Sequence, residues 1–281
     1  NEGPRVYVNK INIAGNTRTI DKVIRREIKL AEGDPYNKYS INYSKDSIRS
    51  LNFFNEVEIN EVRTDFADKI NLEVNVEEKN TGEVSIGAGY SSASEASLNM
   101  GLRENNFLGS GQKVKFETSF ANTRNSYDIS ITEPYFNNKP LSLTTSIYST
   151  VTDPTNVNYE TEDLGFGLST FFPLSTDRYL ELRYSLFTSK IKTKSNATAY
   201  ENALAGTDTV SSLGYTLTFD RRNSRYKPSN GFNFKVSQDL AGLGGDSNYY
   251  RNNLEFNYYK RLSKRLIGAY KFQGGNINGY N

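Results

Sequence analysis

Residues 77–90 read EEKNTGEVSIGAGY, and the periodicity of the chain changes within this stretch. Before this stretch, some segments have apolar residues at helical spacing, and others alternate apolar and polar residues. After it, apolar residues recur at every second position in successive segments up to residue 272. Val84, Ile86, Ala88 and Tyr90 share one face of the 83–90 segment, and small or polar residues occupy the other. This alternation predicts a β-strand with one apolar face.

Eleven such segments follow one another between residues 83 and 272, each near the roughly 9–11 residues that a tilted strand needs to cross a bilayer. Their opposite faces carry charged residues, Ser and Gly, and tight turns alternate with longer polar connections. We therefore predict an antiparallel transmembrane β-barrel; a soluble barrel or sandwich with its apolar face inward is the alternative. The predicted lipid-facing residues are Val84, Leu98, Phe116, Ile129, Leu143, Phe166, Leu182, Leu217, Phe234, Phe256 and Tyr270.

The first 79 residues predict a separate α+β domain with the order strand, helix, helix, strand, strand. Its helices are expected over 19–30, with Thr19 as N-cap, and over 40–51. Its strands are expected over 5–13, 54–62 and 69–76. The predicted domains are therefore 1–79 and 80–281.

Composition excludes several classes of function. The 281 residues include no Cys and no His, which removes Ser-His-Asp and Cys-His nucleophiles, the usual zinc sites and disulfides. A net charge of +2 gives no field that favours nucleic acid as a partner. Mean hydropathy is −0.65, and no stretch approaches the roughly 20 apolar residues of a membrane helix. We expect no catalytic residue, no metal site and no cofactor.

Several short motifs, in this order and spacing, are similar to those of one known family. They are Gly15-Asn16, Ile24-Arg25-Arg26-Glu27, Leu51-Asn52-Phe53-Phe54, the 77–90 junction, Asn106 to Gln112, Glu133-Pro134-Tyr135-Phe136, and Asp220-Arg221-Arg222 through Pro228 and Gly231. Over essentially its whole length the chain resembles the POTRA-containing outer-membrane insertases. The resemblance implies the last POTRA domain followed by the first eleven of sixteen barrel strands. The family's Val-Arg-Gly-Phe/Tyr motif is absent, and the chain ends at about the place where the loop bearing it would begin.

The resemblance also implies a function. It points to a non-enzymatic factor that inserts β-barrel proteins into the bacterial outer membrane, with its POTRA domain in the periplasm. Expected partners are unfolded outer-membrane β-barrel substrates, accessory lipoproteins and outer-membrane lipid. The expected lateral gate is the first barrel strand: Glu83, Val84, Ser85, Ile86, Gly87, Ala88, Gly89 and Tyr90. A POTRA edge strand able to accept a polypeptide is expected at Phe54, Asn55, Glu56, Val57, Glu58 and Ile59.

Other interpretations remain open. Gly87 and Gly89 suit an edge that must open, but small residues also line a tapering barrel. The basic cluster of Arg221, Arg222, Arg225 and Lys227 is either a solvated turn or a contact for lipid phosphates. A polypeptide-translocating pore of the same superfamily and a passive porin with a periplasmic domain are the alternative functions.

Overall fold

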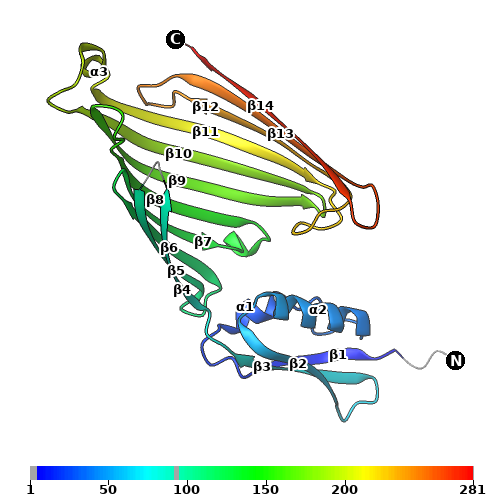
Figure 1. Cartoon of the computed structure of the whole chain (residues 1–281). Coiled ribbons are helices and arrows are strands. Elements are labelled where there is room, and N and C mark those ends of the chain that lie inside the picture. Colours follow the sequence, from blue (N-terminus) through cyan, green and yellow to red (C-terminus); the bar gives the residue numbers. More distant parts are fainter. Residues whose placement is uncertain (1–4, 92–94, 281) are drawn as a thin grey trace. The chain divides into compact units, whose positions relative to one another are not determined.

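The computed structural model describes residues 5–91 and 95–280, which belong to two compact units (Figure 1). Unit 1 comprises Asn1–Glu83 together with Arg103–Val114. Unit 2 comprises Val84–Leu102 and Lys115–Asn281. Among the described residues, no helix is both long enough and apolar enough to span a membrane.

Unit 1 holds a three-stranded sheet with two helices, in the predicted order. Its sheet has the order β1-β3-β2, with β1 parallel and β2 antiparallel to the central β3. The elements are β1 (Tyr7–Ala14), α1 (Asp21–Arg25), α2 (Lys38–Ser50), β2 (Phe54–Arg63) and β3 (Lys69–Glu78).

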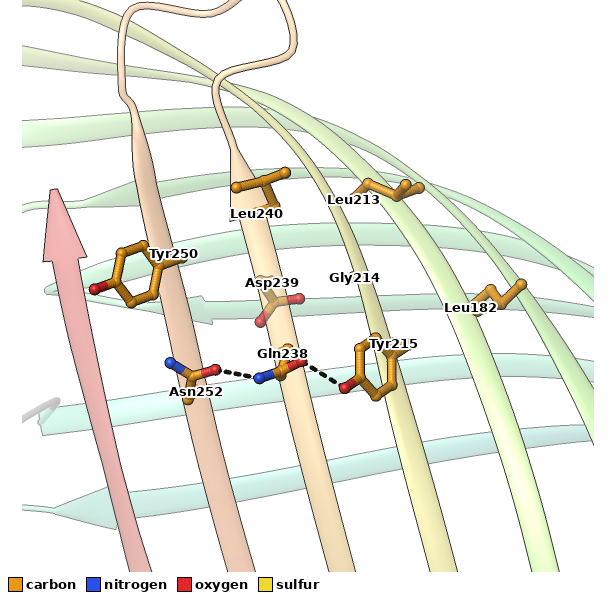
Figure 2. Close-up of a pocket in the computed structure, with 9 residues that line it drawn as sticks. All are labelled: Leu182, Leu213, Gly214, Tyr215, Gln238, Asp239, Leu240, Tyr250 and Asn252. Carbon is orange, nitrogen blue, oxygen red and sulfur yellow. Dashed lines mark hydrogen bonds between the residues drawn. The ribbon is translucent and has the colours of Figure 1, made fainter. Parts of the chain in front are cut away.

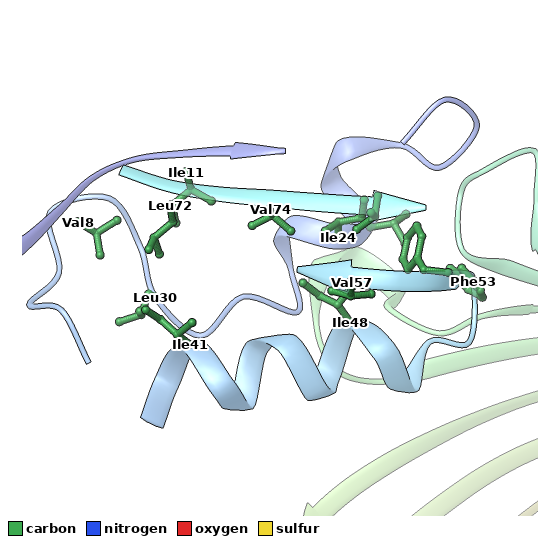
Figure 3. Close-up of a cluster of buried hydrophobic side chains, with 13 residues drawn as sticks. Val8, Ile11, Ile24, Leu30, Ile41, Ile48, Phe53, Val57, Leu72 and Val74 are labelled. Carbon is green, nitrogen blue, oxygen red and sulfur yellow. The ribbon is translucent and has the colours of Figure 1, made fainter. Parts of the chain in front are cut away.

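A closed hydrophobic core holds unit 1 together (Figure 3). In α2, Asn37 caps the first turn by accepting the N–H groups of Tyr39 and Ser40. Ile41 and Ile48, two turns apart, then point from this helix onto the sheet. The core consists of Val8, Ile11, Val23, Ile24, Leu30, Ile41, Ile48, Phe53, Phe54, Val57, Leu72, Val74 and Val76.

The first helix is much shorter than the 19–30 expected from its periodicity. α1 ends at Arg25: the N–H groups of Glu27 and Ile28 bond three residues back, and the N–H of Lys29 donates to the Ser44 hydroxyl of α2 at 2.8 Å. Thr19 is not the N-cap, a position held by Ile20 with no side-chain cap. The buried Thr19 hydroxyl instead accepts a hydrogen bond from the Asn106 amide at 2.9 Å.

The remaining strands form one eleven-stranded sheet in chain order, which confirms the predicted count. Its register partners are antiparallel from β7 through β14. Its strands are β4 (Gly82–Ser91), β5 (Glu95–Phe107), β6 (Gln112–Ala121), β7 (Arg124–Glu133), β8 (Ser142–Thr152), β9 (Tyr159–Ser175), β10 (Arg178–Thr193), β11 (Gly206–Asp220), β12 (Gly231–Ala241), β13 (Tyr249–Arg261) and β14 (Ile267–Gly279). A 3-10 turn (η1, Phe136–Asn138) and a short helix (α3, Ala199–Ala203) lie in its connections.

The register gives this sheet one apolar and one polar face. Ile129, Ile147, Phe166 and Leu186 are partners across β7 to β10 and define the apolar face. Many of its side chains are exposed, including Tyr270 at 68%. A continuous exposed apolar surface of this extent is unfavourable in water, so the sheet requires apolar surroundings.

Candidate functional site

The first strand of the large sheet, β4, forms one of its two edges (Figure 1). Within the described strands, β4 has β5 on one side and nothing on the other, while β14 forms the opposite edge. All ten residues of β4 are exposed. An edge strand presents backbone N–H and C=O groups to which an extended segment can add. The eight predicted gate residues, Glu83 to Tyr90, all lie in this strand.

Glycines at this edge differ from those inside the sheet. A Cβ on Gly165 would lie 2.2 Å from Cζ of Tyr148, and one on Gly214 would lie 2.1 Å from Oδ1 of Asp239. A Cβ on Gly87, in contrast, would meet nothing within 4 Å, and one on Gly89 would lie 3.3 Å from a Ser97 hydroxyl. Close packing therefore requires glycine in the interior strands but not at Gly87, where glycine only weakens the strand.

The segment that leads into β4 is held by one carboxylate of unit 1. Glu78, the last residue of β3, accepts hydrogen bonds from the Thr17 hydroxyl and from the N–H groups of Arg18 and Thr19, at 2.8, 2.9 and 2.6 Å. Burial disfavours its charge, but these donors outweigh that effect and hold the pKa of Glu78 below its ordinary value. The end of β3 is thus tied to the loop that precedes α1.

A tight turn between β5 and β6 is docked on the same loop within unit 1. Gly109 accepts the N–H of Ile20 at 2.9 Å. Asn106 donates to Thr19 and accepts the N–H of Gly111 at 2.8 Å. Gly109 has φ +73°, and a Cβ there would lie 1.9 Å from the Arg18 carbonyl oxygen, so both backbone conformation and space require glycine. This explains the Asn106 to Gln112 motif.

The predicted POTRA acceptor strand, β2, lies at an edge of the small sheet. Phe54 and Val57 point into the core, and Asn55, Glu56 and Glu58 are exposed. Ile59 packs at the margin of the core. The backbone of β2 is open on one side, and its outward side chains are polar or acidic.

All the predicted lipid-facing side chains lie on the apolar face of the large sheet. Register partners link this face without interruption from Ile129 in β7 to Phe272 in β14. A Cβ on Gly101 in β5 would lie near the side chains of Ser85 in β4 and Glu117 in β6, so these three odd-numbered positions share the polar face. Side chains alternate along a strand, so the even-numbered positions of β4 to β6 lie on the apolar face. The polar lining that the sequence predicted is therefore opposite these residues.

The polar face contains an ion cluster that the sequence analysis missed. Asp239, on β12, is only 6% exposed and accepts Nε of Arg183 at 2.8 Å and a terminal nitrogen of Arg251 at 3.0 Å. Arg183 also donates to the Thr216 hydroxyl at 2.6 Å. The three charged residues come from β10, β12 and β13, so the cluster ties non-adjacent strands together. The small Gly214 leaves room for it.

The apolar face contains a hydrogen-bonded row of polar side chains, also unforeseen (Figure 2). The Tyr215 hydroxyl donates to Gln238, whose amide donates to Asn252 at 2.7 Å, and Asn252 donates to Asn276 at 3.1 Å. We call these four residues the polar row. It crosses β11 to β14 beside a cavity of about 440 Å³, whose lining includes Leu182, Leu213, Leu240 and Tyr250. The hydrogen bonds lower the cost of placing amides on an apolar surface.

No group of three or more Asp or Glu side chains in residues 5–91 and 95–280 is arranged to hold a metal ion.

Comparison with known proteins identifies both parts of the chain. Residues 6–79 match the POTRA model, described as a surface antigen variable number repeat, and residues 106–281 match the Omp85 superfamily domain. The outer membrane protein assembly factor BamA of Neorickettsia risticii is 30% identical over 276 residues, and BamA of Nitratidesulfovibrio vulgaris is 25% identical over 276 residues. These alignments cover 97% of this chain but only 37% and 35% of the relatives, so the chain spans about a third of their length.

A solved structure shows the same fold. BamA from Haemophilus ducreyi lacking POTRA domains 1–3 superposes with a TM-score of 0.86 and 24% identity, covering 99% of this chain and 56% of that one. The family resemblance inferred from the motifs is confirmed. The chain belongs to the Omp85 superfamily.

Proposed function

We propose that this chain is part of a non-enzymatic insertase that assembles β-barrel proteins into the bacterial outer membrane, with β4 as the lateral gate. The observation that carries the proposal is the composition of β4, the first strand of the large sheet, in which Gly87 and Gly89 weaken strand pairing without being required by close packing. The relatives named above are outer membrane protein assembly factors, which supports the same function. The predicted localisation in the outer membrane, with the POTRA domain in the periplasm, is supported by the relatives, which are named outer membrane protein assembly factors, and by the POTRA match.

The physical problem for an insertase is the unpaired backbone of its substrate. Each backbone N–H or C=O group that enters hydrocarbon without a partner costs several kcal/mol. An edge strand supplies partners by strand addition and so lowers the cost of insertion. In β4, the backbone edge that faces away from β5 is the edge at which an incoming strand would add.

The apolar face is the second part of the proposal. We assign its side chains to contact with lipid and the opposite face to the barrel interior. In this arrangement the ion cluster around Asp239 faces the interior, where water and polar groups solvate it. We further propose residues 1–79 as the POTRA domain and 80–281 as barrel.

The POTRA edge β2 is a second acceptor for extended polypeptide in this proposal. Its open edge begins at Phe54 and carries exposed Glu56 and Glu58. These carboxylates discourage non-specific pairing with other strand edges and favour partners with complementary charge. Unfolded outer-membrane proteins and accessory lipoproteins of an assembly machinery are the proposed partners.

A disulfide lock on the full-length protein tests the gate. This chain contains no Cys, so once any Cys elsewhere in the full-length protein is replaced, Ser85→Cys paired with a Cys on the closing strand gives a single defined crosslink. We expect the oxidised form to lose assembly of a reporter barrel in vesicles and reduction to restore it. Full activity with the seam locked would overturn the gate.

The matched control is Thr132→Cys with Thr144→Cys. These residues are register partners in the interior strands β7 and β8, and their hydroxyls lie 2.9 Å apart. Oxidation there crosslinks strands that are already paired, so activity should persist. A passive porin would conduct ions and leave the folding of other barrels unchanged, and a translocating pore would export polypeptide without inserting it.

A further inference from the structure

The two ends of the large sheet differ in charge. At the end where β4 begins, three connections join β9 to β10, β11 to β12 and β13 to β14. Counted with the two nearest residues of each flanking strand, they contain nine basic and two acidic side chains. The β8–β9, β10–β11 and β12–β13 connections at the other end contain two basic and four acidic ones by the same count. We call the nine residues the basic rim: Arg178, Arg221, Arg222, Arg225, Lys227, Lys260, Arg261, Lys264 and Arg265.

Only two carboxylates offset these nine cations. Asp177 lies 2.7 Å from Arg221 and 3.8 Å from Arg178, and Asp220 lies 2.8 Å from Arg222 and 3.7 Å from Arg225. In the described part of the chain, no carboxylate lies within 4 Å of the side-chain nitrogens of the remaining five rim residues, Lys227, Lys260, Arg261, Lys264 and Arg265. At the opposite end, in contrast, Lys192 and Lys194 are each paired with a carboxylate. The basic rim therefore has a large uncompensated positive charge.

The basic rim begins where a belt of aromatic side chains ends. One row of register partners on the apolar face consists of Phe219, Phe234, Phe256 and Phe272. The next row toward the rim contains Phe232, Tyr258 and Tyr270.

Cationic side chains of the basic rim lie on the same apolar face, beyond the two aromatic rows. The Arg178 guanidinium lies over the Phe219 ring, 5.7 Å from its centroid. Lys260 follows Tyr258 by two residues and so points to the same side. Aromatic belts mark the level of the lipid headgroups, and Lys and Arg just beyond them lie among the phosphates.

We propose that the basic rim binds the headgroups of anionic phospholipids in the periplasmic leaflet of the outer membrane. The inference rests on the membrane placement in the proposed function, and not on the gate. The charge is spread over six neighbouring strands at one depth, which suits several phosphodiesters side by side in a membrane surface. Exposed Leu262, Leu266 and Ile267 in the β13–β14 connection and its flank add apolar contacts at the same level.

Lipid selectivity of the full-length protein tests the proposal. The protein is reconstituted in phosphatidylcholine vesicles with spin-labelled phosphatidylglycerol or spin-labelled phosphatidylcholine. The motionally restricted fraction of each label gives their relative association constant. We expect a preference for phosphatidylglycerol that weakens as salt is raised, because salt screens exposed charges. Equal association of the two lipids would overturn the proposal.

Two matched double variants locate the effect. Lys260→Gln with Arg265→Gln removes two rim charges, and Lys190→Gln with Arg124→Gln removes the same residue types at the other end of the sheet. All four side chains lack an ion pair in the described residues. We expect roughly a two- to fivefold loss of selectivity in the rim variant and little change in the other. Equal losses would show that no special site exists at the rim.

A second rim variant, Lys227→Gln with Lys264→Gln, changes only turn residues and guards against a folding defect in the first. It should lose selectivity to a similar degree, and unchanged selectivity in both rim variants would overturn the proposal. The measurement contains no substrate. An inactive assembly assay with intact selectivity would therefore refute the insertase function and leave the lipid site standing.

Discussion

Units 1 and 2 place their apolar residues in opposite ways. Thirteen hydrophobic side chains of unit 1 are buried in a closed core. In the described part of unit 2, only Val210 and Ala241 reach that degree of burial, while Phe272 is 62% exposed and Leu164 61%. Unit 1 is stabilised by excluding water from its own interior, whereas the large sheet needs lipid to cover its outer surface. Mutations of one chemical type should therefore have different costs in the two units.

The largest effect is expected in the core of unit 1. Leu72→Ala removes a side chain that is 1% exposed and leaves a cavity, at a cost of about 2–5 kcal/mol. Leu240→Ala removes the same atoms from a side chain that is 46% exposed. Lipid chains fill that space, so only the transfer free energy is lost, about 1–2 kcal/mol. Urea unfolding of each unit, followed by hydrogen exchange in the full-length protein, measures both; equal costs would contradict the comparison.

The next test compares the two faces of one strand. Leu217→Arg puts a charge on the apolar face of β11 and should cost about 2–4 kcal/mol near the bilayer midplane. Thr218→Arg, one residue on, puts it on the polar face and should cost well under half of that. Denaturant unfolding from vesicles gives both values. The reverse order would mean that the apolar face lines the interior and that the membrane assignment is wrong.

A smaller effect separates the interior of the sheet from its edge. Gly165→Ala forces a Cβ against the Tyr148 ring and should cost about 1–3 kcal/mol. Gly87→Ala meets no atom and should leave sheet stability unchanged or raise it by about 0.5–1 kcal/mol. The same Gly87→Ala should slow assembly if an easily opened edge matters. Faster assembly by this variant would contradict that role.

The smallest expected effect is the pH dependence of two loops, each held by one carboxylate, in unit 2 and in unit 1. Glu201 accepts the N–H groups of Thr198 and Asn158, at 2.7 and 2.9 Å, and these bonds lower its pKa to about 2. Because the pKa of Glu201 is lower in the folded state, its carboxylate stabilises the fold fully above the ordinary pKa near 4.5, and this stabilisation is lost as pH falls toward 2. Glu78 in unit 1 shares the direction of shift. Both loops should therefore loosen on acidification.

Carbon-13 titration of the two carboxyl groups, with backbone amide shifts of Thr198 and Thr19 as reporters, checks this expectation. In Glu201→Gln, the Thr198 amide should lose its acid transition while the Thr19 amide keeps it. A Thr198 transition that persists in this variant would assign the pH response to another group.

The sequence predicted most of the fold because alternation is a property of each strand by itself. The period-two pattern from residue 83 onward was enough to predict eleven strands and their apolar face. It was not enough to predict the polar row or the ion cluster around Asp239, because those contacts depend on which residues of different strands stand opposite each other. The short α1 was missed for a similar reason: Ser44, fifteen residues away, takes the Lys29 N–H.

The polar row also acts on the accuracy of folding. A slip of one residue between strands reverses the faces, so hydrophobicity alone prevents it. A slip of two residues restores the faces and escapes that penalty. In a sheet misaligned between β11 and β12, Gln238 would stand opposite Leu213 or Leu217 instead of Tyr215, and its side-chain oxygen would lose the hydrogen bond from Tyr215 in hydrocarbon. The four residues of the polar row therefore disfavour a two-residue register shift, which the alternation of apolar and polar residues does not disfavour.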